Sequence, residues 1–214
     1  MLNTTLKLSL LAGLSMVFFC GATHAATEAG RLAVVSGNVK VGKSEDDKNG
    51  RAVRPNEPVF NDDVIMTGEG AAAKVLFTDQ SLMDLGPNAA LKVSDYALKA
   101  GENRTGTFSI LYGKLRALVT RKVGDKGKVE VRSGDAVMGV RGTEFVVDAP
   151  RPIPGFPSPG TQVIVVSGLV NVRPPAGGPS MAGGAGQMVV ANPKTFAQAA
   201  QAQSADMGEK QMRR

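Results

Sequence analysis

Pairs of neighbouring carboxylates are the residues of this sequence best suited to acid–base chemistry. They are Asp62 with Asp63, Asp79 with Asp84, and Glu130 with Asp135 or Glu144. Two carboxylates that face one cleft are the machinery of glycoside hydrolysis. Adjacent strand residues point to opposite faces, however, and an Asp at a turn routinely accepts backbone hydrogen bonds. We therefore interpret these carboxylates as turn and surface residues and predict that the chain is not an enzyme.

The first residues have the pattern of an export signal. Lys7 supplies the positive charge, residues 8–20 are apolar, and Thr23-His24-Ala25 are small enough to precede a cleavage point. We predict that residues 1–25 form a signal peptide and that the mature chain is periplasmic. No later segment approaches 18 consecutive apolar residues, so we expect no transmembrane span after cleavage.

Cleavage after Ala25 would remove Cys20 and His24, the only cysteine and the only histidine. The mature chain then lacks the residues for a disulfide, a Cys/His zinc site, a Ser-His-Asp triad or a Cys-His pair. The alternative is a lipoprotein acylated at Cys20. The bulky residues 17–19 before this cysteine are unlike the small residues that such a signal requires.

A metal site or a cofactor is not expected. Residues 42–54 carry mixed charges, and their carboxylates do not follow the regular oxygen-ligand spacing of a calcium loop. We interpret this segment as a solvated loop.

Basic residues are concentrated around one predicted hairpin in a chain of formal charge +6. They are Lys114, Arg116, Arg121, Lys122, Lys126, Lys128 and Arg132. Nucleic acid is not an expected partner, because the chain has an export signal and only 5% aromatic residues for base stacking. The favoured interpretation is a solvated hairpin that protects sheet edges. The alternative is contact, above all through Lys114, Arg116, Arg121 and Lys122, with a partner such as an anionic lipid, an acidic glycan or an acidic protein face.

Residues 149–160 carry five prolines around Ile153 and Phe156. Proline cannot donate to a sheet ladder and favours extended backbone. We favour a stiff connector between strands. The alternative is a protruding loop that presents Phe156 to a partner.

The rest of the chain predicts short strands separated by turns. Val129-Glu130-Val131-Arg132 alternates as a strand with one wet face does. An apolar pair followed by a glycine and apolar alternation recurs at Gly37, Gly113 and Gly168. We predict an all-β fold of short twisted strands in residues 26–192, as a sandwich or a β-solenoid-like arrangement. Residues 193–214 are expected to form a short helix over 195–203, capped by Thr195, and a disordered end.

One phrase stands out between two apolar runs, and it contains Gly139, Val140, Arg141, Gly142, Thr143 and Phe145. Glycine serves positive φ or a close backbone approach, and arginine offers five donors to carbonyls or a carboxylate. We predict a structural role in which both glycines are needed for backbone geometry. Arg141 is expected to bond inward, for example to Glu144.

This phrase resembles the end of the FecR domain, an all-β module of bacterial envelope proteins. The segments 62–68, 73–81 and 109–115 resemble earlier FecR motifs in the expected order, so the match covers residues 62–148. Asp62 and Gln80 stand where the family has turn glycines, and Ser133-Gly134 replaces the usual Thr-Pro.

The resemblance implies a non-catalytic periplasmic module that binds a protein partner or senses a signal. Signalling members of the family link an outer-membrane receptor to a sigma factor through a transmembrane helix. Because we find no such helix after the signal, we expect no direct sigma-factor role. The alternative function is a structural envelope protein that binds peptidoglycan or another anionic envelope component through the basic hairpin.

Overall fold

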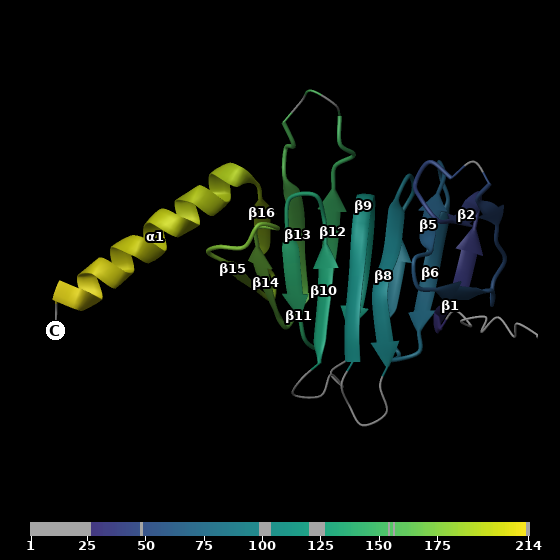
Figure 1. The fold of residues 1–214 in the computed structure, drawn as a ribbon, viewed down its shortest axis with the longest axis horizontal. Helices are drawn as coiled ribbons and strands as arrows, with labels where there is room; N and C mark the ends of the chain where they lie inside the picture. The colour runs from purple at the N-terminus through teal and green to yellow at the C-terminus, as the bar shows by residue number, and fades with distance from the viewer. Residues whose placement is uncertain are drawn as a thin grey trace, which may run out of the picture.

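The computed structural model of the protein describes residues 27–47, 49–98, 104–119, 127–153, 155 and 157–212. The predicted signal peptide lies outside these ranges. Figure 1 shows strands side by side along the long axis of the molecule, with one helix projecting from the end opposite the first strands. The predicted all-β fold is confirmed.

The strands form two sheets that share one long strand, β9 (Arg104–Val119). Sheet A has the order β4-β1-β6-β7-β9-β12-β13-β16 and sheet B the order β3-β2-β5-β8-β9-β10-β11-β14-β15. The other strands of sheet A are β1 (Glu28–Ser36), β4 (Pro58–Phe60), β6 (Ala72–Phe77), β7 (Leu82–Leu85), β12 (Thr143–Ala149), β13 (Thr161–Ser167) and β16 (Met188–Ala191). Those of sheet B are β2 (Val39–Gly42), β3 (Arg51–Ala52), β5 (Val64–Thr67), β8 (Ala90–Leu98), β10 (Lys128–Arg132), β11 (Val137–Val140), β14 (Leu169–Arg173) and β15 (Met181–Gly184).

Strand β9 passes from one sheet to the other at Gly113. The residues from Arg104 to Tyr112 pair with β8, and those from Gly113 to Val119 pair with β12. Gly113 has φ +91°, which a residue with a Cβ rarely adopts. A Cβ there would lie 2.5 Å from the Cβ of Ala89, so the crossing requires glycine.

The three glycines of the recurring sequence pattern lie where the chain crosses from one sheet to the other. Gly37 (φ +73°) lies between β1 and β2, and Gly168 (φ +85°) lies between β13 and β14. Each packs against a neighbouring crossing, since a Cβ on Gly37 would be 3.0 Å from Ala71 and one on Gly168 would be 2.8 Å from Cγ2 of Thr143. The sequence did not distinguish a β-sandwich from a β-solenoid-like arrangement. The structure has two facing sheets, between which the chain crosses repeatedly at glycines.

The two sheets pack face to face through one core of mainly aliphatic side chains. Phe77 of sheet A meets Phe108 of sheet B edge-on, with ring centroids 4.8 Å apart, and Tyr96 lies beside both. Alternating residues of each strand point into this core, as in β12, where Thr143, Phe145 and Val147 are buried. Burial of this kind is the main source of stability in a chain without disulfides among its described residues.

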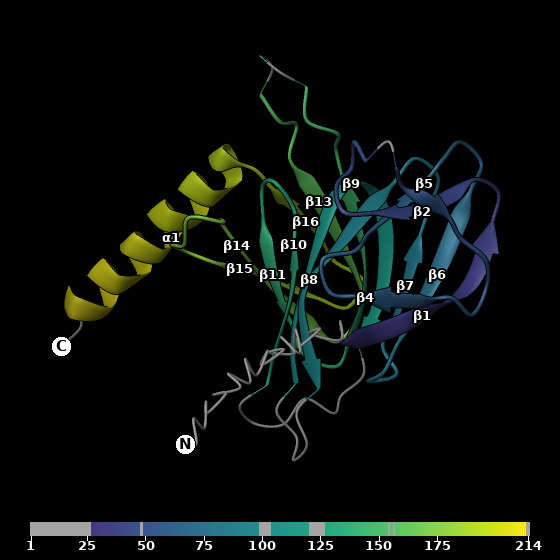
Figure 2. The same cartoon turned by 45° about the vertical axis from the view of Figure 1, so that its right-hand side comes forward.

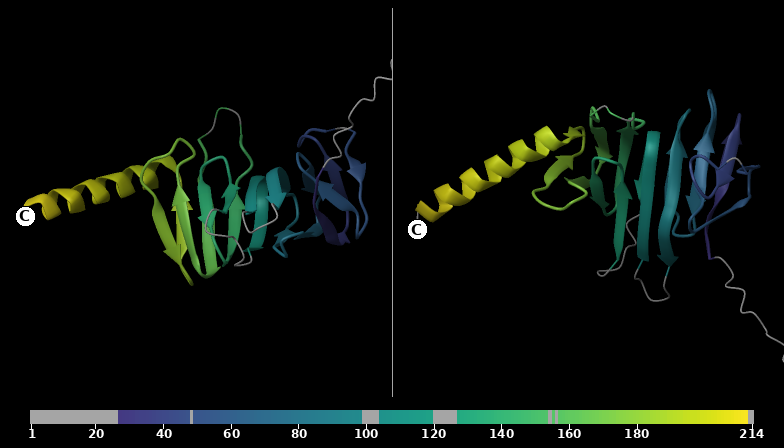
Figure 3. Two further views of the ribbon diagram at one scale, coloured as in Figure 1. Left: turned by 60° about the horizontal axis from the view of Figure 1, so that its bottom comes forward. Right: turned by 45° about the horizontal axis from the view of Figure 1, so that its top comes forward.

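The C-terminal helix is longer than predicted. Helix α1 spans Pro193–Met212 rather than residues 195–203, and Asn192, not Thr195, is its cap. Asn192 Oδ1 accepts the backbone N–H of Thr195 at 2.9 Å, and Thr195 Oγ1 accepts that of Asn192 at 3.0 Å. This reciprocal cap, with proline at the first helical position, starts the helix early. Phe196 is buried and ties the first turn to the sheets, from which the rest of α1 projects (Figures 2 and 3).

Two turns keep a left-handed backbone without glycine. Asp62 has φ +65° and Gln80 has φ +67°, at the positions where the resemblance placed family glycines. The turn geometry is therefore retained, and two side chains are held in a conformation that costs roughly 1–2 kcal/mol per residue.

Gln80→Gly is expected to raise the free energy of unfolding by about 0.5–1 kcal/mol. Relief of the left-handed backbone outweighs the extra chain entropy that glycine loses on folding, about 0.5–1 kcal/mol. Chemical denaturation of a chain that comprises residues 26–214 measures the gain. Gln80→Ala is the matched control, because it removes the same side chain but keeps the strain; an equal gain in this control would contradict the explanation.

Candidate functional site

The central motif forms the end of β11, a crossing to sheet A, and the start of β12. Gly142 has φ +62°, so its predicted backbone role is confirmed. Val140, Thr143 and Phe145 are buried. Together they build the crossing on which Gly168 packs.

Of the expectations for the motif, the one for Gly139 is wrong. Arg141 is exposed, and Glu144 Oε1 accepts a hydrogen bond from Nε of Arg116 at 2.8 Å. This hydrogen bond raises the pKa of the Arg116 guanidinium. Gly139 has no left-handed φ, and a Cβ built on it would meet only the carbonyl oxygen of Asn171, at 3.9 Å. Backbone geometry therefore does not require glycine at position 139.

The basic residues do not form the predicted hairpin. Strand β10 runs parallel to β9, with Lys128 opposite Thr105, so the chain returns to the far end of β9 before continuing. Lys114 and Arg116 lie in the sheet A half of β9, and Lys128 and Arg132 lie in sheet B. Arg121 and Lys122 lie outside the described residues. The four described cations of this set are divided between the outer faces of two sheets and do not form one basic hairpin surface.

In sheet A the cations are paired with acids on neighbouring strands. Lys114 Nζ lies 3.5 Å from Asp148 Oδ2, and Lys74 Nζ lies 3.4 Å from Asp84 Oδ1. Exposed pairs of this kind contribute little stability and offset their charges.

In sheet B, three cations surround one buried carboxylate. Glu130 is 4% exposed, and its carboxylate accepts from Lys128 Nζ at 2.8 Å, from an Nη of Arg132 at 2.6 Å and from an Nη of Arg173 at 2.9 Å. Burial raises the pKa of Glu130, but the three charged donors outweigh it and lower this pKa to about 2. The side chains of Lys128, Arg132 and Arg173 therefore cover the centre of the face of β10 that was predicted to be solvent-exposed.

The proline loop, residues 149–160, is fastened to sheet B at both ends. Asp135 Oδ2 accepts from Ser158 Oγ at 2.6 Å and from Thr161 Oγ1 at 3.3 Å. At the other end the guanidinium of Arg151 lies over the ring of Tyr112, 3.6 Å from its centroid. Near its two ends, the loop is thus in contact with sheet B through Arg151 and Ser158.

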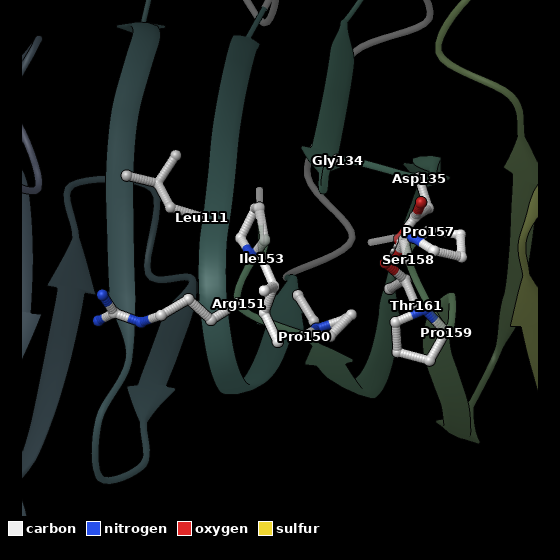
Figure 4. Close-up of a pocket in the computed structure, with 12 residues that line it drawn as sticks. Leu111, Gly134, Asp135, Pro150, Arg151, Ile153, Pro157, Ser158, Pro159 and Thr161 are labelled. Carbon is white, nitrogen blue, oxygen red and sulfur yellow. Dashed lines mark hydrogen bonds between the residues drawn. The ribbon is translucent and has the colours of Figure 1, made fainter. Parts of the chain in front are cut away.

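A pocket of about 310 Å³ lies under this loop (Figure 4). Leu111 and Ile153 lie on one side of it, and the hydrogen-bonded group of Asp135, Ser158 and Thr161 lies on the other. A second depression of about 360 Å³ shares Leu111, Gly134 and Pro152 with the pocket and continues it as a groove. We call the two together the proline-loop groove.

Ile153 is the exposed apolar residue of this groove, with 62% of its surface accessible. Phe156, the partner contact that the sequence offered as the alternative to a stiff connector, lies outside the described residues. Ile153 stood in the same proline-rich run, and no sequence pattern ranks one above the other. The described part of the chain contains no group of three Asp, Glu, His or Cys residues placed to hold a metal ion.

The family model described as FecR protein matches residues 63–171. The chain belongs to the FecR protein family. The matched segment runs from β5 into β14 and contains the proline loop, the crossings at Gly113 and Gly168, and the central motif. It thus extends beyond the resemblance seen over residues 62–148.

The other comparisons of this FecR-family chain match only part of its length. An uncharacterized protein of Treponema pallidum (strain Nichols) is 32% identical over 88 residues, which are 41% of this chain and 13% of that protein. Two crystal structures of a candidate anti-sigma factor from Parabacteroides distasonis give TM-scores of 0.48 and 0.46, with 19% and 20% identity. Each alignment covers 60% of this chain and 54% of the other, so the chain spans about half of these proteins. No described helix has the length and apolar composition that a membrane span needs.

Proposed function

We propose that this FecR-family chain is a non-catalytic periplasmic module that binds a protein partner in the bacterial envelope and relays or restrains a signal. The periplasmic location rests on the export pattern of residues 1–25. The family suggests signalling, because its signalling members receive a signal from an outer-membrane receptor.

The proline-loop groove is the observation that carries the proposal. Binding surfaces combine exposed apolar anchors with a scaffold that is already in its bound shape. Ile153 supplies the anchor, and the contacts of Asp135 and Arg151 hold the two ends of the loop against the sheet. Prolines add stiffness, so little conformational entropy is lost when a partner orders the loop.

Site-specific crosslinking in intact cells tests the proposal. A photo-crosslinking residue in place of Ile153 is expected to yield a discrete adduct with one protein. Ile153→Asp, with the photo-crosslinker at position 157, is expected to lose most of that adduct, since a buried unpaired charge costs several kcal/mol at an interface. Val34, 48% exposed on the outer face of sheet A, is the matched control position.

Two outcomes distinguish an error in the proposed site from an error in the proposed function. An adduct at position 34 and none at 153 would mean that a partner binds elsewhere, which contradicts the groove. No protein adduct from either position would contradict an interaction function itself.

A further inference from the structure

Gly139 occupies the centre of the outer face of sheet B, where neither backbone geometry nor packing requires glycine. It pairs with Glu130 of β10 on one side and with Asn171 of β14 on the other. The nearest atom to a Cβ built at this position is the carbonyl oxygen of Asn171, at 3.9 Å, which is an ordinary van der Waals contact. Glycine within a strand weakens it, and it often marks a place where another molecule approaches the backbone.

A shallow hollow of about 270 Å³ has Gly139 in its lining. We call it the Gly139 hollow. Its rim includes Lys128, Arg141, Leu169 and Asn171. The pairing of β10, β11 and β14 places Arg132 and Arg173 on either side of Val137, one step along the same face. Lys128, Arg132 and Arg173 surround the carboxylate of Glu130 beside the hollow, and these four groups together carry a formal charge of +2.

Glu130 holds these three cations beside the hollow. Its two oxygens accept hydrogen bonds from Lys128 Nζ, from Nε and an Nη of Arg132, and from an Nη of Arg173, and its side chain is almost fully buried. An ammonium has three donors and a guanidinium five, so each cation keeps further donors. Side chains already ordered by a buried partner lose less entropy when they bind an anion.

We propose that the Gly139 hollow binds an acidic segment of a protein partner, with a carboxylate over Gly139 and an apolar side chain against Leu169. The positive charge selects the carboxylate, and guanidinium groups match its planar geometry. Leu169 is 61% exposed at the rim, which favours an amphipathic peptide over a purely polar glycan or inorganic phosphate. That the partner is a protein rests on the proposed function. The hollow and the proline-loop groove are, however, separate sites.

Fluorescence anisotropy of the mature chain with a labelled peptide of alternating Glu and Leu tests this site. Gly139→Val is expected to weaken binding about tenfold or more, a loss of about 1.4 kcal/mol, because it fills the hollow without changing the charge. Its thermal midpoint should equal or exceed that of the wild type, since the side chain has room and valine favours strands. Lys128→Ala should also weaken binding, and Lys114→Ala on sheet A, which removes the same charge, should not.

The outcomes decide between this site and its alternatives. Equal affinity of Gly139→Val and wild type would mean that the peptide is attracted by charge alone, which overturns the proposal. A peptide of alternating Lys and Leu should not bind. Binding of inorganic phosphate or of phosphatidylglycerol vesicles that is lost in Gly139→Val, without peptide binding, would assign the hollow to phosphate and also overturn it. Because the peptide assay needs no cellular partner, it can succeed or fail independently of the crosslinking at Ile153.

Discussion

Gly113→Ala is expected to lower the free energy of unfolding by about 4 kcal/mol, a large part of the 5–15 kcal/mol typical of a domain. Two causes add. A side chain at φ +91° stores about 1–3 kcal/mol of backbone strain. The new Cβ would also lie 2.5 Å from the Cβ and 2.6 Å from the Cα of Ala89, and relieving such overpacking costs about 1–3 kcal/mol. Urea denaturation monitored by circular dichroism measures the loss.

Two further variants identify the cause. Gly134→Ala is the matched control, because its Cβ has open space and its φ is not left-handed, so it should stay within about 0.5 kcal/mol of wild type. Ala89→Gly should restore part of the loss in the Gly113→Ala background, with a coupling energy of about 1 kcal/mol. If Gly113→Ala unfolds like the Gly134→Ala control, β9 does not cross between the sheets as the structure has it.

The crossings show what a sequence can reveal without contacts. The recurring pattern at Gly37, Gly113 and Gly168 can be recognised in the sequence, but the crossings between sheets at these glycines cannot. A strand that changes sheet has the same alternation of apolar and polar residues as a strand that stays in one sheet. The left-handed backbone of Gly142 followed from its position between two strands. For Gly139, the same argument failed, since only the neighbours across β10 and β14 reveal that the position is open.

The predicted basic hairpin failed for a topological reason. Lys114 and Lys128 are close in sequence, and nearby strands usually pair antiparallel. Here β9 extends over 16 residues and ends in sheet A, so β10 pairs with its beginning, in parallel. The partner of Glu130 on β14, Arg173, is 43 positions away and had no local signal. The fold class and the motif depend on local patterns, whereas the two candidate surfaces depend on pairings between distant strands.

Glu130→Gln is expected to lower the free energy of unfolding at pH 7 by about 2–3 kcal/mol. The substitution keeps the shape of the side chain but removes the charge that neutralises Lys128, Arg132 and Arg173. The pKa of Glu130 is lowered from 4.5 to about 2, and each pKa unit corresponds to about 1.4 kcal/mol. Partial exposure of the three cations reduces the effect below the full conversion. Denaturation in urea at pH 7 measures it.

The pH dependence supplies the second half of this prediction. A carboxylate with a lowered folded-state pKa contributes its stability fully above the unfolded value, here 4.5, and loses it as the pH falls towards about 2. The difference between wild type and Glu130→Gln should therefore be constant from pH 7 to about pH 5 and shrink towards zero at about pH 2. Glu28→Gln, which removes the exposed partner of Arg31, is the matched control and should change stability by less than about 0.5 kcal/mol at every pH. A difference for Glu130→Gln that is as small as the control, or that grows as the pH falls, would mean that the three cations do not stabilise a buried carboxylate, and the ordered rim of the Gly139 hollow would lose its physical basis.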